Sequence, residues 1–149
     1  MIDDRDRIIL QALQENARAT FAEVGQRAGL AASSVHDRVR RLEQSGAIRG
    51  YHASIDPAAM GLHVTAIMAV RPLDPRQEDD IPERIADLAE VVACHSVAGE
   101  YNYILIVRVP SPLGLEEFIG RLRERANVQT HTTVVLSTPF EDRAVPSAV

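Results

Sequence analysis

The sequence has no lysine and no tryptophan, and Cys94 is the single cysteine among its 149 residues. One cysteine excludes an internal disulfide and a zinc site built from several cysteines. No stretch approaches the roughly 20 apolar residues that cross a bilayer, and the acidic start of the chain does not resemble a secretory signal. We therefore expect a cytoplasmic globular protein without membrane association, folded as one ordinary domain or two small ones.

All 16 basic residues are arginines, and the net charge is −5. This charge is unevenly distributed, since residues 1–52 carry +1 and residues 53–149 carry −6. Within residues 27–49, five arginines stand against two acids, which gives +3. A basic segment in an acidic chain is typical either of a DNA-contacting surface or of an ordinary solvated helix face. Charge alone favours the ordinary helix face.

The first 50 residues predict three helices with short connections. Apolar spacing indicates helices over residues 4–16, 21–28 and 32–44. Thr20 and Glu23 have the spacing of a capping box at the start of the second helix, and Gly29 is suited to the left-handed turn that ends it. Two helices joined by a tight glycine turn are typical of a helix-turn-helix.

The third helix has an apolar stripe, formed by Val35, Val39 and Leu42, that predicts which face is exposed. Small side chains at its start would allow it to enter the major groove, and histidine and arginine donors would then reach bases and phosphates. We therefore predict that this segment binds double-stranded DNA. The predicted DNA-binding residues are Ser33, Ser34, His36, Asp37, Arg40 and Arg41.

Residues 1–50 are thus assigned to a DNA-binding domain, and residues 51–61 to a strand and linker. We expect the strand to begin at Ile48 and to stop at Asp56-Pro57, because the intervening residues favour extended structure and an Asp-Pro pair favours a turn.

Residues 62–149 alternate between strand and helix patterns in the order βαββαβ. Alternating or β-branched runs predict strands, and a serine-proline pair marks the start of the second helix. This order predicts an α+β, ferredoxin-like domain with both helices on one face of an antiparallel sheet. The uncovered face suggests dimerisation through the sheets, and the polar tail from about residue 141 is expected to be flexible. The expected strands are residues 62–71, 91–98, 101–109 and 128–137, and the expected helices begin near residues 81 and 111.

No catalytic or metal-binding group is predicted. Cys94 and His95 are neighbours in an expected strand, so their side chains point to opposite faces and cannot act on one atom. We expect Cys94 to be buried and structural. His63, His95 and His131 lie in three different expected strands without a cluster of other ligands.

The chain resembles the leucine-responsive/asparagine-regulatory (Lrp/AsnC) family of transcription regulators, particularly its actinobacterial members. The resemblance covers nearly the whole length, including an N-terminal winged helix-turn-helix and a C-terminal effector and oligomerisation domain. The stretches that carry it are Asp6-Arg7-Ile8-Ile9-Leu10, residues 35–42, Gly46-Ala47-Ile48-Arg49-Gly50-Tyr51, and residues 94–103.

The resemblance implies homo-oligomers, from dimers to octamers or other rings of dimers, with amino-acid effectors bound near the turn between the second and third strands of the effector domain. Gly99 exposes backbone N–H groups that suit a carboxylate. Asn102 stands where the family usually has an acid, and an amide holds an ammonium group more weakly. Ala31 replaces the usual serine or threonine cap of the third helix. Thr132 is either an ordinary strand residue or an effector contact. The predicted effector-binding residues are Gly99, Glu100, Tyr101, Asn102 and Thr132.

We therefore predict a sequence-specific DNA-binding transcriptional regulator that responds to a small effector, most simply an amino acid. It is not expected to be an enzyme, and no cofactor or metal is implied. One alternative is a sensing or assembly module that does not bind DNA. The other is a small enzyme on a ferredoxin-like fold, which would require a catalytic cluster on one face.

Overall fold

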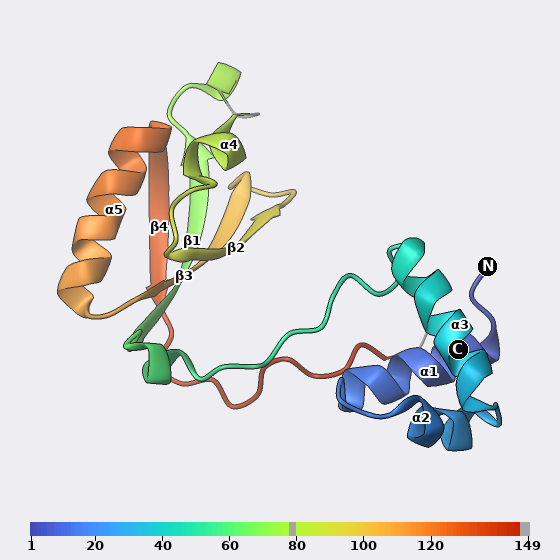
Figure 1. The fold of residues 1–149 in the computed structure, drawn as a ribbon. Helices are drawn as coiled ribbons and strands as arrows, with labels where there is room; N and C mark the ends of the chain where they lie inside the picture. Colours follow the sequence, from blue (N-terminus) through green and yellow to red (C-terminus); the bar gives the residue numbers. More distant parts are fainter. Residues whose placement is uncertain (78–79, 147–149) are drawn as a thin grey trace. The chain divides into compact units, whose positions relative to one another are not determined.

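The computed structural model describes residues 1–77 and 80–146, which form two compact units (Figure 1). The first unit comprises Met1–Ser54 together with the chain from Phe140 onward, and the second comprises Ile55–Pro139. No helix in the described part of the chain is long and apolar enough to cross a membrane.

Three helices make up the first unit, and side-chain caps start the first two. The Asp3 carboxylate accepts from the Asp6 N–H at 2.8 Å, and Thr20 and Glu23 form the predicted capping box. Gly29 ends the second helix in the left-handed conformation, with φ of 64°, where glycine avoids the strain that a Cβ causes. The helices are α1 (Asp4–Glu15), α2 (Phe21–Ala28) and α3 (Ala32–Gln44).

The core of this unit lies where the three helices meet. Ile9, Val24 and Val35 are fully buried there, one from each helix. A Cβ on Gly25 would lie 2.5 Å from the carbonyl oxygen of Leu30, so glycine permits the α2–α3 turn to fold back tightly against α2. The helix-turn-helix predicted from the sequence is confirmed.

The strand expected from Ile48 to Asp56 is not formed. This segment has no regular structure, and it leads into the 3-10 helix η1 (Pro57–Met60), whose first turn is capped by Asp56. A strand is stable only when a neighbouring strand satisfies its backbone N–H and C=O groups. The described residues of this chain provide no such neighbour, so β propensity alone does not produce a strand or a wing here.

Residues 140–146 of the C-terminal segment belong with the first unit, although they were expected to continue the second domain. The N–H of Val145 donates to the Gln14 side chain of α1 at 2.7 Å, and the Ser54 hydroxyl donates to Asp142 at 3.2 Å. The position of the tail is therefore determined by contacts with residues far away in the sequence. The residue pattern within the tail could not predict these contacts.

The second unit has the predicted βαββαβ order. Its antiparallel sheet has the order β2-β3-β1-β4, and α4 and α5 pack on the same face (Figure 1). The elements are β1 (Val64–Pro72), η2 (Pro75–Gln77), α4 (Ile81–Ile85), β2 (Val91–Ser96), β3 (Tyr103–Val109), α5 (Pro112–Ala126) and β4 (Val128–Val134).

Alternation along the strands divides the sheet into two faces. Ala66, Met68 and Val70 of β1 are fully buried against the helices, together with Phe118 of α5. Ile67, between them, is 40% exposed on the opposite face. Successive strand residues point to opposite sides, so the second face carries apolar side chains that this chain does not cover.

The two capping carboxylates, Asp3 and Glu23, predict that the folded state loses stability at acidic pH. The Arg38 hydrogen bond lowers the pKa of Asp3 below its ordinary 3.8, and the Thr20 backbone N–H lowers the pKa of Glu23 below its ordinary 4.5. Below about pH 4.5 the unfolded chain therefore binds more protons than the folded chain, so stability falls as the pH decreases. Circular-dichroism melting curves should give a constant melting temperature above pH 5.5 and a falling one below 4.5. Glu23→Gln should weaken this dependence, and a melting temperature independent of pH would contradict it.

Candidate DNA-binding face and effector turn

Helix α3 exposes all six residues predicted to contact DNA. Val35, Val39 and Leu42 are buried, and each of the six lies outside that stripe and is solvent-exposed. The predicted orientation of the helix is therefore correct. The role of these side chains toward DNA stays a prediction.

The start of α3 is open to an anion. Its N-cap, Ala31, provides no side-chain acceptor, and its first turn contains no acidic residue. Ser33 and Ser34 are exposed there. The first N–H groups of a helix lack intrahelical partners and carry a partial positive charge. This arrangement suits a phosphate oxygen.

His36 is positioned by both α2 and its own helix. Its ring meets Phe21 edge-on, with 5.5 Å between the centroids, and Nδ1 lies 3.4 Å from an Asp37 carboxylate oxygen. The Asp37 side chain is 83% exposed. The two residues thus share one polar edge of α3, beside the turn from α2.

The arginines of α3 differ sharply in their partners. Arg40 makes no hydrogen bond or ion pair with any described residue. One Arg38 nitrogen lies 2.7 Å from both Asp3 and Asp6, and one Arg41 nitrogen lies 3.4 Å from Asp6. Among the residues that the structure describes, the guanidinium of Arg40 therefore has no partner, unlike those of Arg38 and Arg41.

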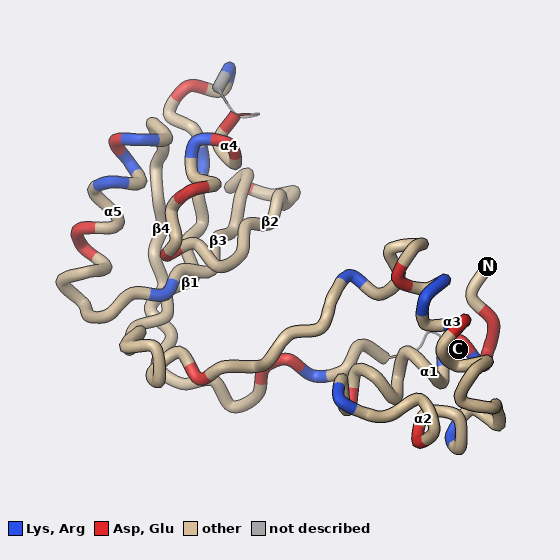
Figure 2. The backbone as a smooth tube through the Cα atoms, in the orientation of Figure 1, with Lys and Arg blue, Asp and Glu red and all other residues tan. Residues whose placement is uncertain are grey.

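These contacts correct the inference drawn from local charge. The net charge of +3 counted over residues 27–49 leaves out acids from elsewhere in the sequence that pair with these arginines. Arg27 pairs with Glu15 of α1 at 2.7 Å, and Arg38 pairs with Asp3 and Asp6. Figure 2 shows α3 bearing both signs of charge. The face is less basic than the sequence window indicates.

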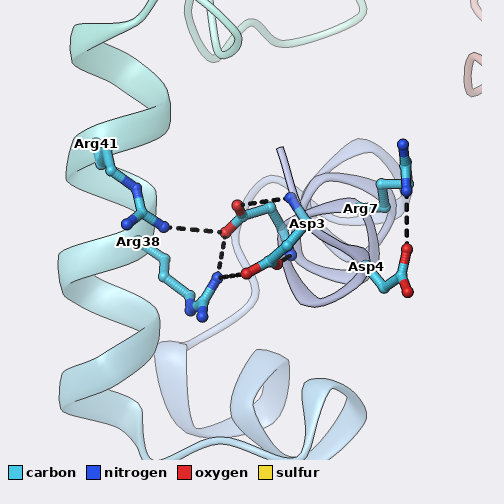
Figure 3. Close-up of polar contacts among 6 residues, drawn as sticks. Asp3, Asp4, Arg7, Arg38 and Arg41 are labelled. Carbon is cyan, nitrogen blue, oxygen red and sulfur yellow. Dashed lines mark hydrogen bonds and ion pairs between the residues drawn. The ribbon is translucent and has the colours of Figure 1, made fainter. Parts of the chain in front are cut away.

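Asp6 is the site residue that sequence reasoning missed. Its carboxylate is 2% exposed and lies between α1 and the Arg38 and Arg41 side chains (Figure 3). Acids at the start of a helix by themselves indicate only a cap and a favourable interaction with the helix dipole. The available signal was Asp6 itself, since an aspartate three residues before the buried Ile9 falls on the inward side of α1.

Another contact joins α3 to the segment that follows it. The Tyr51 hydroxyl donates to Glu43 at 2.9 Å. Partial burial, with this carboxylate, raises the pKa of Tyr51 to about 12. The phenol therefore stays protonated and keeps donating throughout the neutral range.

The predicted effector turn connects β2 to β3. The Val97 N–H donates to the Asn102 carbonyl at 2.9 Å, and the Asn102 N–H donates to Val70 at 3.0 Å. Gly99 does not adopt the left-handed conformation, and no heavy atom lies within 4 Å of where its Cβ would be. Within one chain, therefore, neither strain nor crowding requires glycine at 99.

Arg71 organises the side chains beside this turn. Its guanidinium lies 5.6 Å from the centre of the Tyr101 ring and 3.7 Å from the Glu100 carboxylate, and it donates to Gln129 at 2.9 Å. The Tyr101 ring lies 6.3 Å from the His131 ring. This cluster, Arg71, Glu100, Tyr101, Gln129 and His131, is called the turn cluster below.

Thr132 does not join the turn cluster. It pairs with Met68 across the β1–β4 ladder, and directly paired residues share a face. Since Met68 is buried against the helices, Thr132 lies on the helix-covered face. His131 pairs with Ala69 on the open face. The contact of Thr132 with an effector stays a prediction.

Cys94 is exposed, contrary to the expectation of burial. It lies on β2, which is an edge strand, and only partial desolvation raises the pKa of its thiol. Among the described residues, no three His, Cys, Asp or Glu side chains are grouped so as to hold a metal ion.

The fold and α3 together define a helix-turn-helix protein with a ferredoxin-like second domain. The AsnC-type helix-turn-helix domain model matches residues 2–43, and the Lrp/AsnC ligand binding domain model matches residues 65–145. The chain belongs to the Lrp/AsnC family. It is accordingly a DNA-binding transcriptional regulator and not an enzyme.

Two regulators from other organisms are similar to this chain along nearly its full length. The HTH-type transcriptional regulator LrpA of Mycobacterium tuberculosis is 48% identical over 142 residues, covering 95% of each chain. The regulator Ptr1 of Methanocaldococcus jannaschii is 33% identical, covering 95% of this chain and 96% of its own.

Two solved structures of similar proteins contain L-methionine. The feast or famine regulatory protein of M. tuberculosis in that complex is 47% identical, with a TM-score of 0.94, covering 97% of this chain and 99% of its own. A transcriptional regulator of Neisseria meningitidis with L-methionine is 28% identical, with a TM-score of 0.89, covering 98% and 97%.

The contrast between Arg38 and Arg40 predicts different effects on stability. Arg38→Ala should lower the free energy of unfolding by about 2–3 kcal/mol, because the buried Asp6 carboxylate loses its shortest contact with a cation and keeps the Asp3 N–H at 3.2 Å and Arg41 at 3.4 Å. Arg40→Ala should change it by less than about 0.5 kcal/mol, as expected for an exposed side chain without contacts. Urea unfolding of both variants measures the difference. Equal losses would contradict the assigned role of Arg38.

Proposed function

We propose that this regulator binds DNA through the exposed face of α3 and senses an amino acid at the turn cluster. The observation that carries the first part is Arg40, which has no hydrogen-bond or ion-pair partner among the described residues and lies on the same helix as the uncapped N-terminus of α3. The guanidinium fits a guanine edge or a phosphate bidentately. The free N–H groups fit a second phosphate and fix the orientation of the helix.

A homodimer would present two such helices. Half-sites about 34 Å apart, one turn of B-DNA, would then form a pseudo-palindrome. The open face of the sheet, with Ile67 exposed on it, supports a dimer formed through that face. We further propose that dimers assemble into octamers or other rings, and that the protein acts in the cytoplasm, where its DNA is.

The turn cluster has the chemistry that an α-amino acid requires. The effector carboxylate would take backbone N–H donors near Gly99, where the missing side chain leaves room. Its ammonium group would take Glu100, which at 3.7 Å is only loosely held by Arg71. The L-methionine complexes of two related regulators make methionine the first effector to test.

Binding at a contact between dimers would link the effector to assembly. An effector that prefers one assembly shifts the equilibrium only by its difference in affinity for the two. DNA affinity changes with it when the spacing between recognition helices differs between the assemblies. No cofactor is part of this proposal.

Arg40→Ala should weaken binding to a DNA duplex selected from a random pool by the wild-type protein. The expected loss is roughly 5-fold to 150-fold, because one base or phosphate contact is worth about 1–3 kcal/mol. Electrophoretic mobility shifts over a range of salt concentrations measure it. Arg18→Ala removes the same charge from an exposed residue of the same unit outside α3, and it should retain wild-type affinity. A changed oligomer with intact DNA affinity would contradict the assigned face.

Thermal-shift screening of the twenty amino acids should give at least one hit, with methionine tested first. A ligand at 100 times its Kd stabilises the folded state by about 2.7 kcal/mol. His131→Ala should reduce the shift, because His131 belongs to the turn cluster. His63→Ala, an exposed histidine before β1, is the matched control and should retain the shift. No hit among the twenty would refute the amino-acid effector.

A further inference from the structure

Two carboxylates at the start of α1, those of the N-cap Asp3 and of Asp6, contact the recognition helix. Asp3 and Asp6 share one nitrogen of Arg38, each at 2.7 Å, and Asp6 also lies 3.4 Å from Arg41 (Figure 3). The four side chains have equal numbers of positive and negative charges. Two of the three arginines of α3 are therefore neutralised before DNA is present.

The burial of Asp6 makes this pairing obligatory. Its carboxylate is 2% exposed, so water compensates little of its charge, and the two arginines do so together with the Asp3 N–H, which donates to it at 3.2 Å. The side chain of Arg38 is itself only 23% exposed. The side chain of Arg41 is 62% exposed, so its guanidinium faces solvent while one nitrogen is directed to Asp6.

We propose that Asp6 is a specificity-determining residue, which limits non-specific DNA binding by holding Arg38 and Arg41 in ion pairs. Non-specific binding comes from phosphate contacts alone, so every free guanidinium adds to it. Specific binding also requires base contacts and therefore a fixed position of α3. One buried carboxylate serves both requirements, because it neutralises charge and fixes α3 against α1. The inference rests on the proposed DNA-binding face of α3.

Asp6→Asn tests this proposal, because it removes the charge with almost no change in shape. Arg41 then loses its acidic partner and is free to contact a phosphate. One added contact steepens the slope of log K against log salt by about 0.9. If both proteins bind equally at about 1 M salt, this difference in slope makes Asp6→Asn bind a random-sequence 30-bp duplex about five-fold more tightly at about 0.15 M salt. Discrimination between a duplex selected by the wild-type protein and the random duplex should fall by at least the same factor.

Asp4→Asn is the matched control. Asp4 lies two residues away on the same helix, is 94% exposed and pairs with Arg7 at 2.8 Å, on the side of α1 away from α3 (Figure 3). Both variants change the net charge by +1. Asp4→Asn should therefore keep the wild-type salt slope and discrimination, so that any shift specific to Asp6→Asn reports the contact with α3.

Two further variants extend this test, and the first of them does not depend on whether Asp6→Asn folds. Asp3→Asn removes one partner of Arg38 and retains a good N-cap, and it should give a smaller shift of the same sign. If Asp6→Asn does fold, adding Arg41→Gln should restore the wild-type slope. Circular-dichroism melting establishes which variants are folded at the assay temperature.

The outcomes separate this inference from the proposed function. If the wild-type protein shows no salt-dependent DNA binding, the proposed function is wrong. If the wild-type protein binds and folded Asp6→Asn matches Asp4→Asn in slope and discrimination, Asp6 has only a structural role. Weaker non-specific binding by Asp6→Asn would also overturn the inference, because it would show that Asp6 directs the arginines toward phosphates.

Discussion

A buried carboxylate joins the first helix of this protein to the third. Asp6 lies at the α1–α3 contact and accepts from Arg38 at 2.7 Å, while Asp3, which caps α1, holds the same guanidinium. The position of the recognition helix therefore depends on a charge at the start of the chain. Breaking a buried pair is much more destabilising than losing an exposed one, so this contact restricts which residues α3 can present to DNA.

The second unit depends on a different constraint, the alternation of side chains along its strands. Met68 and Val70 pack against the helices, while Ala69 and Arg71 point to the other face. The same alternation places His131, whose ring lies 6.3 Å from that of Tyr101, on the opposite face of β4 from Thr132. An effector bound at the turn cluster, as proposed, would lie on the face that the helices leave open. Effector binding and assembly would then involve the same surface of the sheet.

Patterns local in sequence were sufficient to predict most of the fold. The Thr20–Glu23 capping box, the glycine turn at Gly29 and the stripe on α3 each depend on residues a few positions apart, and all three are confirmed. What the sequence could not provide involves partners far along the chain. The segment after Ile48 has no neighbouring strand among the described residues, and the tail hydrogen-bonds to Gln14. Arg38 and Arg41 pair with an acid more than 30 residues away. For the site, the exposed face of α3 was predictable, and the pairing of its arginines was not.

The ion pairs between α1 and α3 give a structural reason for using arginine and not lysine. A single Arg38 nitrogen bonds two carboxylates, and the planar guanidinium keeps further donors in a fixed arrangement. A lysine ammonium is a more strongly hydrated point charge, and bringing it beside the buried Asp6 would require more desolvation. Arginine therefore suits the contact between α1 and α3, where Arg38 meets the buried Asp6 and the half-exposed Asp3. Arg40, on the same helix, has no ion pair with any residue that the structure describes.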